Sequence, residues 1–311
     1  MNGKILITDT LFILAEHEQK LRDAGYEIER LETPNATEEQ LIEHLKDKVG
    51  YILGGIEQVT DKVIEAAPNL KAIVFTGAGW KSYIPGYELA TKKRIAIANT
   101  PKANTYAVAE YTIALMIGMI RNLFELGRTG SKKFETTKSL NELTVGIIGM
   151  GSIGSKVAQM LHGLGVKEIV YYSPNPKSEI ETQTGAKLVS LDELLSQSDI
   201  VSLHASQEAG SNFIGKVQLA KMKDSALLIN CGFTGGVDKD ALYDELSSGR
   251  LRAAQDDPMD ERYNSLPLSV WFNSNSHIAY NTFEANKTAS DMATQSLLNL
   301  LSTGSDINKV N

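Results

Sequence analysis

Short apolar runs alternate with amphipathic stretches along the first hundred residues. Between the runs, apolar residues recur at helical spacing behind Thr37, which begins a capping box, and behind Thr60. Four runs are rich in β-branched residues and too short for helices, so they predict buried strands at 4–8, 51–53, 71–75 and 94–98. Strands that alternate with helices through short turns predict a parallel sheet covered on both faces.

The pattern changes in the middle of the chain and then resumes. Residues 107–126 predict one long helix, and its apolarity on all sides indicates burial between two bodies. Residues 127–141 are polar and typical of a surface connection. Further strands are expected at 144–148, 168–172, 200–203 and 226–230, and helices at 191–197 behind Ser190 and at 282–301. The whole pattern predicts an α/β protein.

Composition narrows the class of protein. The 311 residues suffice for about two domains, and 42% hydrophobic with 22% charged residues excludes a disordered tail or a fibre. A net charge of −7 disfavours nucleic acid and anionic membrane surfaces as partners. The single cysteine, Cys231, excludes an internal disulfide and indicates a reducing compartment. With no recognisable secretory signal or membrane-spanning run, we expect a cytoplasmic globular protein.

The strongest chemical signal is the segment GMGSIG at 149–154, which fits G-x-G-x-x-G between a predicted strand and a predicted helix. Gly149 permits a tight turn, Gly151 permits close approach of a pyrophosphate, and Gly154 permits close helix–strand packing. Ser152 and Ile153 begin the helix whose N-terminus attracts phosphates. We therefore predict a dinucleotide site; glycines that serve packing alone are the alternative.

The next predicted strand bears on the choice of coenzyme. An Asp or Glu at its end would bind the ribose 2′-hydroxyl of NAD, but the segment YSPNPK at 172–177 contains no acid. Ser173 repels no phosphate, and Lys177 can pair with one. We expect NAD(P), with a leaning towards NADP; Lys177 as an ordinary solvated lysine is the alternative.

Several ordered motifs between about residues 77 and 285 carry a family resemblance. They are NTPKANTYAVAE at 99–110, DIVSLH at 199–204, MK at 222–223, IN at 229–230, VD at 237–238, AL at 241–242, SHIA at 276–279 and EA at 284–285. In these motifs the chain resembles the D-isomer-specific 2-hydroxyacid dehydrogenases, the family of phosphoglycerate, glyoxylate/hydroxypyruvate and formate dehydrogenases. The resemblance implies two doubly wound parallel-sheet domains and a homodimer. A Rossmann dinucleotide-binding domain at 101–280 would be inserted into a flavodoxin-like substrate domain at 1–100 plus 281–311.

The resemblance also implies a reaction, in which a hydride passes between NAD(P)H and a small-molecule carbonyl while a histidine moves the proton. His277 stands in the place of that histidine and Glu261 in the place of its supporting carboxylate. A carboxylate on one ring nitrogen fixes the tautomer and favours the protonated form. Asp256 matches the acid that contacts the nicotinamide carboxamide. The other expected cofactor-binding residues, beside His277, are His204, Ala205, Cys231, Gly232 and Phe233.

Alternatives stay open for several of these residues. His277 as a purely structural histidine is one. Cys231 as a nucleophile is disfavoured, because no matched base accompanies it. We expect His17, His44 and His162 on helix surfaces, and we single out no metal ligands.

One departure from the family pattern concerns the substrate. The pattern I-N-x-x-R-G-x-x-V-D here reads INCGFTGGVD at 229–238, so Phe233 replaces an arginine that holds the substrate carboxylate. The family's substrate loop G-A-G-V-D aligns with GAGWK at 77–81. The expected substrate-binding residues are Ala78, Gly79, Trp80, Lys81, Asn104 and Phe233.

Two interpretations of this departure remain open. Lys81 supplies the missing charge, or the substrate is an aldehyde, ketone, imine or unusual oxo acid that uses Trp80 and Phe233 as apolar walls. Lys81 as an ordinary exposed loop lysine is the alternative to a role in binding. The alternative to an enzyme is a catalytically weak NAD(P)-binding sensor or regulatory protein. Retention of both His277 and Glu261 favours the enzyme.

Overall fold

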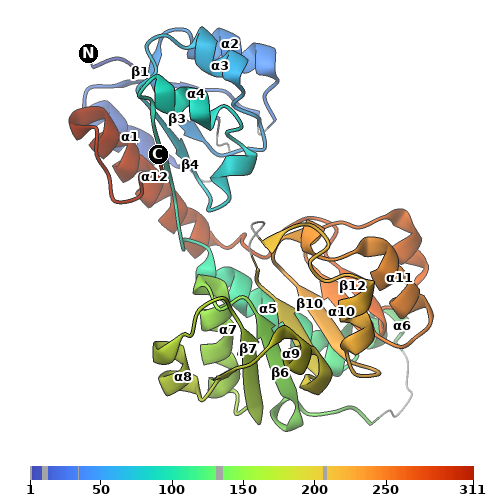
Figure 1. The fold of residues 1–311 in the computed structure, drawn as a ribbon. Coiled ribbons are helices and arrows are strands. Elements are labelled where there is room, and N and C mark those ends of the chain that lie inside the picture. The colour runs from blue at the N-terminus through green and yellow to red at the C-terminus, as the bar shows by residue number, and fades with distance from the viewer. Residues whose placement is uncertain (1, 9–12, 34, 131–135, 206–208) are drawn as a thin grey trace. The chain divides into compact units, whose positions relative to one another are not determined.

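The computed structural model describes residues 2–8, 13–33, 35–130, 136–205 and 209–311. The chain divides into two compact units (Figure 1): unit 1 is Met1–Asn104 with Asn281–Asn311, and unit 2 is Thr105–Tyr280. Each unit has its own parallel β-sheet with helices on both faces.

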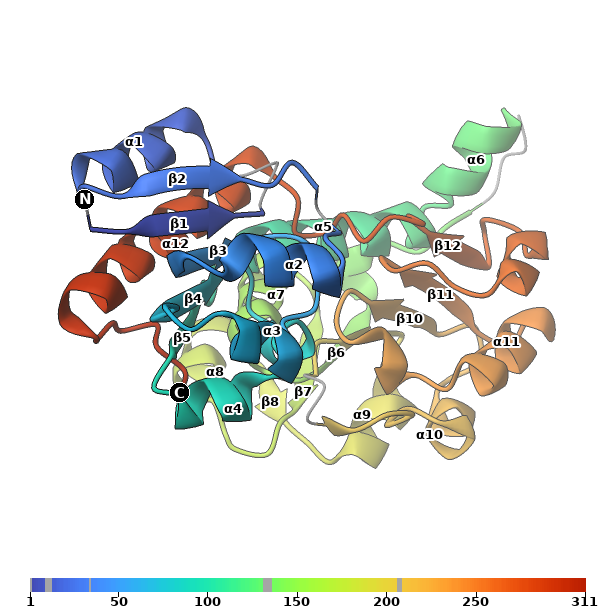
Figure 2. The same cartoon turned by 90° about the horizontal axis from the view of Figure 1, so that it is seen from above.

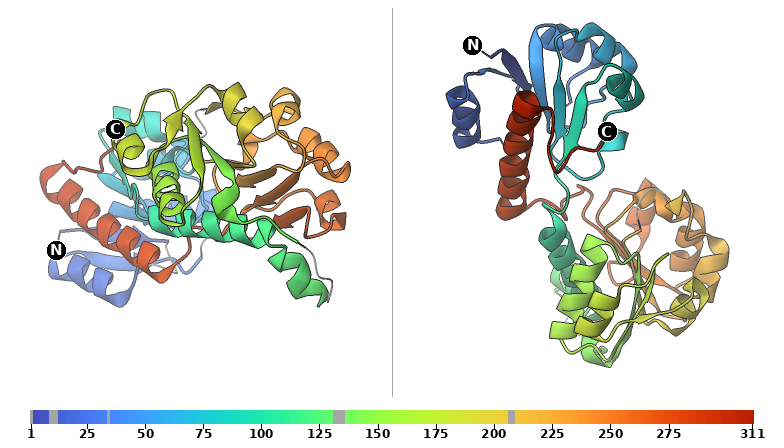
Figure 3. Two further views of the ribbon diagram at one scale, coloured as in Figure 1. Left: turned by 90° about the horizontal axis from the view of Figure 1, so that it is seen from below. Right: turned by 60° about the vertical axis from the view of Figure 1, so that its left-hand side comes forward.

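The sheet of unit 1 has the strand order β2-β1-β3-β4-β5, which is the doubly wound order of flavodoxin. Its strands are β1 (Lys4–Ile7), β2 (Glu27–Arg30), β3 (Lys48–Leu53), β4 (Ala72–Phe75) and β5 (Ala96–Asn99). Its helices are α1 (Ala15–Asp23), α2 (Glu38–Leu45), α3 (Asp61–Ala66), the 3₁₀ turn η1 (Trp80–Ser82), α4 (Tyr87–Lys92) and α12 (Phe283–Thr303). Helices α1 and α12 cover one face and α2, α3 and α4 the other (Figures 2 and 3).

The sheet of unit 2 has the order β12-β11-β10-β9-β6-β7-β8, which is the Rossmann order with one more strand at its edge. Its strands are β6 (Thr144–Ile148), β7 (Glu168–Tyr172), β8 (Lys187–Leu188), β9 (Ile200–Leu203), β10 (Leu227–Asn230), β11 (Arg252–Gln255) and β12 (Trp271–Asn273). Its helices are α5 (Thr105–Ile120), α6 (Leu123–Thr129), η2 (Leu140–Glu142), α7 (Ser152–Gly163), α8 (Ser178–Thr184), α9 (Leu191–Gln197), α10 (Lys216–Lys221), η4 (Thr234–Gly236), α11 (Lys239–Ser247) and η5 (Glu261–Ser265). The predicted fold class is confirmed.

Side-chain alternation along the strands builds a core on each face of the sheet. In β1, Leu6 packs with the α2 and α3 side of unit 1, whereas Ile5 and Ile7 pack with the α1 and α12 side. In unit 2, α5 and α7 bury one face, and α9, α10 and α11 bury the other. All the strands of a sheet are parallel, so their carboxyl ends lie along one edge, where loops gather polar side chains.

The prediction of one continuous helix at 107–126 is wrong. It is two helices, α5 and α6, because Asn122 between them adopts a left-handed conformation with φ of 54°. Helix α6 also occupies part of the predicted surface connection, of which residues 131–135 lie outside the described residues. Among the described residues no single helix can cross a membrane; α5 and α6 reach the required length and apolarity only as a pair bent by 65°.

Two smaller expectations also differ from the structure. Thr60 precedes α3, but its hydroxyl donates to Glu38 at 2.6 Å rather than capping the helix. His17, expected on a helix surface, is buried, because α1 packs on α12 and the ring Nε2 lies 3.2 Å from Asp291. The capping boxes at Thr37 and Ser190 are confirmed.

Candidate active site

The glycine-rich turn joins β6 to α7, as the sequence predicts. Gly149 has φ of +94°, and a Cβ there would lie 2.7 Å from the main chain of His204. A Cβ on Gly154 would collide with the carbonyl oxygen of Gly149. Around Gly151, by contrast, a Cβ would meet nothing within 4 Å. Two glycines are therefore required by packing, whereas the third leaves its face open.

A cavity of about 430 Å³ lies against this turn, at the carboxyl ends of β6, β7 and β9. In the strand order, β6 lies between β7 and β9, which is the topological switch point where doubly wound sheets bind ligands. The open Gly151 and the apolar lining fit the pyrophosphate and base of a dinucleotide. Six of the predicted cofactor-binding residues line the cavity: Gly149, Gly151, Ser173, Lys177, His204 and Ala205.

His204 is a neutral polar group in this lining. Its Nε2 pairs with the Ser202 hydroxyl at 2.8 Å, and burial lowers the pKa of the ring to about 4. Its Nδ1 is buried and has no partner among the described residues. A buried polar atom without a partner is costly, so a bound ligand that pairs with it would be stabilised here.

Cys231 follows β10 and does not line the cavity. Burial raises the pKa of its thiol to about 12, although a hydrogen bond with Thr112 acts in the opposite direction. The raised pKa favours the protonated thiol, which further disfavours Cys231 as a nucleophile. Gly232, the next residue, is half-buried, with its N–H bonded to Asn230 at 3.0 Å.

His277 lies in the loop that follows β12, with φ of +47° and a half-exposed ring. Its Nδ1 is hydrogen-bonded to the carboxylate of Asp257, and the carboxylate of Asp256 is 3.8 Å from the same atom. The hydrogen bond to Asp257 raises the pKa of His277, burial lowers it, and the charges of both acids raise it further. The ring Nε2 has no partner within the described part of the chain, so it can exchange a proton with a ligand.

The predicted pairing of His277 with Glu261 needs correction. Asp257 is the second residue after β11, and β11 and β12 are parallel neighbours, so this carboxylate and the His277 loop lie at the same sheet edge. Glu261 comes later, in η5, where it is exposed, and among the described residues no hydrogen bond or ion pair joins it to His277. The doublet of acids directly after a strand was the sequence signal for Asp257.

Asp256 anchors the His277 loop. Its side chain is buried, and its two oxygens accept the N–H groups of Ile278 and Ala279, each at 2.9 Å. The Ser274 hydroxyl donates to the same carboxylate at 3.0 Å. The observed contacts of Asp256 therefore hold the loop in its left-handed shape. A contact with the nicotinamide carboxamide stays a prediction.

The loop after β4 holds most of the residues that were expected to bind substrate. Ala78 and Gly79 are exposed, and their N–H groups have no acceptor among the described residues. The Asn99 side chain donates to the Ala78 carbonyl at 3.0 Å and shapes the loop. Asn104, the last residue of the first segment of unit 1, is half-buried. Two exposed N–H groups in succession can bind an anionic oxygen.

Trp80 and Lys81 make contacts within unit 1 that the sequence did not predict. Trp80 belongs to the core of unit 1, is 9% exposed, and packs edge-on against Tyr87 with ring centroids 5.5 Å apart. Lys81 Nζ lies 5.8 Å from the Trp80 ring centroid and 6.0 Å from that of Tyr87. This burial does not support an apolar substrate wall at Trp80, and the aromatic contacts account for the position of Lys81.

Phe233 is half-buried directly before η4. Its ring folds over its own turn, since a Cβ on Gly235 would lie 2.6 Å from the ring Cζ. The charged groups that act on the pKa of His277 are the carboxylates of Asp257 and Asp256, both within 4 Å of its Nδ1. Phe233 itself brings no charge to the place that the family's arginine takes.

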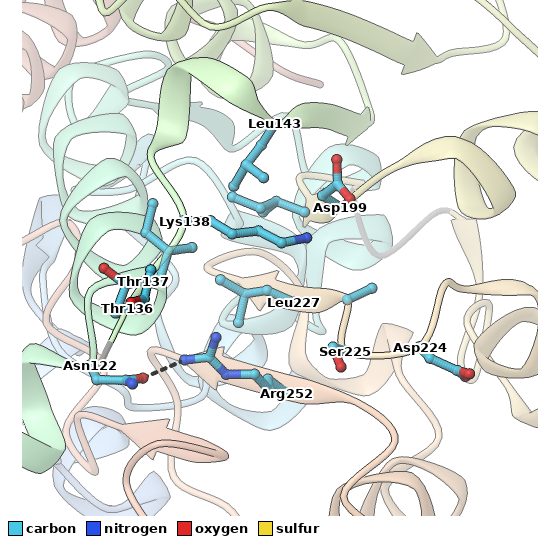
Figure 4. Close-up of a pocket in the computed structure, with 13 residues that line it drawn as sticks. Asn122, Thr136, Thr137, Lys138, Leu143, Asp199, Asp224, Ser225, Leu227 and Arg252 are labelled. Carbon is cyan, nitrogen blue, oxygen red and sulfur yellow. Dashed lines mark hydrogen bonds between the residues drawn. The ribbon is translucent and has the colours of Figure 1, made fainter. Parts of the chain in front are cut away.

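A second cavity, of about 200 Å³, lies at the amino ends of β6, β9, β10 and β11 (Figure 4). The Arg252 guanidinium there donates to the carbonyl of Met119, to Asn122 at 2.9 Å and to the carbonyl of Ser269 at 2.8 Å. These bonds fasten the bend between α5 and α6 to the sheet, so we assign the cavity a packing role. Within the described ranges, no three His, Cys, Asp or Glu side chains group as metal ligands would.

Comparison with known proteins extends these observations. A family model described as "D-isomer specific 2-hydroxyacid dehydrogenase, NAD binding domain" matches residues 113–279. The chain is 34% identical over 278 residues to a glyoxylate reductase of Thermococcus litoralis, which covers 84% of this chain and 81% of that protein. A solved glyoxylate reductase from Paecilomyes thermophila superposes with a TM-score of 0.83 at 28% identity, covering 100% of this chain and 99% of that one.

The chain also matches longer proteins. It is 33% identical over 267 residues to the D-3-phosphoglycerate dehydrogenase of Methanocaldococcus jannaschii, which covers 83% of this chain but 49% of that protein. It thus spans about half the length of the D-3-phosphoglycerate dehydrogenases that it matches. A family model over more than half of the chain and a 34% identical relative confirm the resemblance drawn from the motifs: this chain belongs to the D-isomer-specific 2-hydroxyacid dehydrogenase family.

Proposed function

We propose that the protein transfers a hydride between NAD(P)H and the carbonyl group of a small molecule, with His277 moving the proton. The dinucleotide, when bound, supplies the hydride. Nε2 of His277 donates a proton to the carbonyl oxygen during reduction and takes it back during oxidation. The observation that carries this proposal is a ring whose Nδ1 is held by a carboxylate while its Nε2 has no partner among the described residues.

In this proposal each unit binds a different ligand. Unit 2 binds the dinucleotide in the cavity beside Gly151, and unit 1 binds the substrate through the N–H groups of Ala78 and Gly79 and the side chain of Asn104. The family resemblance further supports a homodimer. Light scattering of the purified protein measures that state directly.

The test of this function is turnover by the wild-type protein. We expect reduced coenzyme to be consumed, as its absorbance reports, with at least one member of a panel of small aldehydes, ketones and 2-oxo acids. Fluorescence titration measures coenzyme binding in parallel. Binding without turnover of any carbonyl compound would instead support a sensor.

The proposed substrate is an aldehyde, ketone or imine, which lacks a carboxylate next to the reacting carbon, or an unusual oxo acid. Phe233 offers no charge in the place of the family's arginine, and the carboxylates of Asp256 and Asp257 lie within 4 Å of His277 Nδ1. A 2-carboxylate in this place would lose its bidentate partner and face two negative charges. Aldehydes, ketones and imines avoid both penalties.

Phe233→Arg tests this substrate class. We expect the variant to gain at least about tenfold in kcat/KM for glyoxylate, because a guanidinium restores a charge-assisted bidentate pair. Activity with an apolar aldehyde should fall in the same variant. Phe233→Leu is the control, since it removes the ring without adding charge. A wild-type protein that already prefers glyoxylate, and gains nothing from the arginine, would disprove the proposed substrate class.

The proposed coenzyme is NADP. No acid follows β7 at the place where a carboxylate would bind the ribose of NAD, and Ser173 and Lys177 line the cavity there. Lys177→Ala should raise the KM for NADPH about tenfold and leave that for NADH nearly unchanged, because one charge-assisted contact with the 2′-phosphate is lost. Lys167→Ala is the control, since this exposed lysine lies at the opposite end of β7. A strong preference of the wild-type protein for NADH would contradict the assignment.

A further inference from the structure

Two neighbouring acids follow β11, and only one of them can orient His277. Both oxygens of Asp256 accept N–H groups of the loop, at 2.9 Å each, and the Ser274 hydroxyl donates to one of them. The carboxylate of Asp256 therefore stabilises the loop, and its Oδ2 lies 3.8 Å from Nδ1 of His277, beyond hydrogen-bond distance. Asp257 makes the direct hydrogen bond to Nδ1.

The Asp257 carboxylate is fixed from a second side. The Thr234 hydroxyl donates to Oδ2 of Asp257, while His277 bonds to Oδ1. The main-chain oxygen of Asp257 accepts the buried Gln255 amide at 3.1 Å. The main chain of Asp257 is thus held by Gln255 of β11, and its carboxylate is held by Thr234 in the turn after β10.

Thr234 stands where the pattern I-N-x-x-R-G-x-x-V-D has a glycine, directly after the phenylalanine that replaces its arginine. Glycine has no hydroxyl to donate. The bond between Thr234 and Asp257 is therefore tied to the same two-residue departure that removes the arginine.

We propose that Asp257, held by Thr234, is the positioning carboxylate of His277 and takes the role that the family resemblance gives to Glu261. This inference rests on the proposed function. A hydroxyl that donates to a carboxylate favours its ionised form, and an ionised carboxylate on Nδ1 favours the imidazolium. It also fixes the tautomer of the neutral ring, in which Nδ1 carries the hydrogen and Nε2 is left to face the ligand.

The surroundings of His277 set the direction of the pH effect. The carboxylates of Asp257 and Asp256 act on the charge of the imidazole, and the Tyr280 ring packs beside it with its centroid 5.3 Å away. Both acids favour the protonated ring, which is the form needed to reduce a carbonyl. Loss of Asp257 should therefore move the high-pH limit of reduction to lower pH.

The experiment is an NMR titration of the histidine ring protons of the full chain, which has five histidines. The spectrum of His277→Gln assigns the resonance. In Asp257→Asn we expect the pKa of His277 to fall by about one unit, and in Thr234→Val to fall by less. Thr234→Ser keeps the hydroxyl and should restore the wild-type value. Asp244→Asn is the control, because that acid is exposed on α11 and its carboxylate has no partner among the described residues.

Turnover supplies the second measurement. The high-pH limit of kcat/KM for reduction should move down by the same amount in Asp257→Asn, and kcat should fall about tenfold or more, with coenzyme affinity retained. The proposal is overturned if Glu261→Gln produces these shifts and Asp257→Asn does not. If the wild-type protein turns over no carbonyl compound, the proposed function fails, whereas the titration still decides whether Asp257 sets the state of His277.

Discussion

Replacement of His277 by glutamine should lower kcat by about a hundredfold to ten-thousandfold, because a positioned general acid contributes that much to a proton transfer. Glutamine is close in size and polar, but it cannot deliver a proton. The ring is half-exposed and belongs to no hydrophobic core, so the free energy of unfolding should change little. Stopped-flow and steady-state assays with the best substrate of the panel measure the loss.

The binding measurement separates chemistry from structure in this variant. The cavity beside Gly151 does not include His277 among its lining residues, so the affinity for NADPH should stay within about twofold of wild type. His162→Gln is the matched control, since that histidine is exposed in the last turn of α7. Full turnover by His277→Gln would remove the proton donor from the proposed reaction and leave a nucleotide-binding fold without assigned chemistry.

Strands and helices were predictable where the fold buries them on both sides. The runs that became β1, β4, β6 and β10 are apolar because helices cover both faces of a doubly wound sheet. The sequence pattern did not predict four strands, namely β2, β8, β11 and β12. Those at the sheet edges are short and partly exposed, and β2 carries charged residues at three of its four positions. Their place is set by pairing with a neighbour, which no local pattern contains.

In the candidate site, too, some features could be predicted from the sequence and others could not. The glycine-rich turn was predictable because its steric demands are local, within six residues of chain. The partner of His277 was not, because it depends on how two loops leave adjacent strands, 20 residues apart in sequence. The burial of Trp80 was not predictable, because the sequence shows an aromatic ring in a loop but not the direction that the ring takes into the core.

Gly154→Ala and Gly151→Ala should have opposite consequences. A Cβ on Gly154 would overlap the carbonyl oxygen of Gly149, which is main chain and cannot rotate away. Either α7 or the turn must shift, so we expect a loss of about 1–3 kcal/mol in the free energy of unfolding, with dinucleotide affinity lost as the turn deforms. Denaturant unfolding and fluorescence titration measure the two effects.

Gly151→Ala should leave stability nearly unchanged, because its Cβ would meet nothing within 4 Å and its φ of −80° suits alanine. The added methyl group instead enters the space where a pyrophosphate approaches the main chain, so dinucleotide affinity should fall at least about tenfold. Gly163→Ala, at the end of the same helix with open space around it, is the control for both measurements. If Gly151→Ala bound NADPH and NADH as wild type does, the phosphates would have to lie elsewhere, and the cavity beside the turn would lose its assignment. A stable Gly154→Ala variant with full affinity would show that the turn yields without cost, which the overlap with the Gly149 carbonyl argues against.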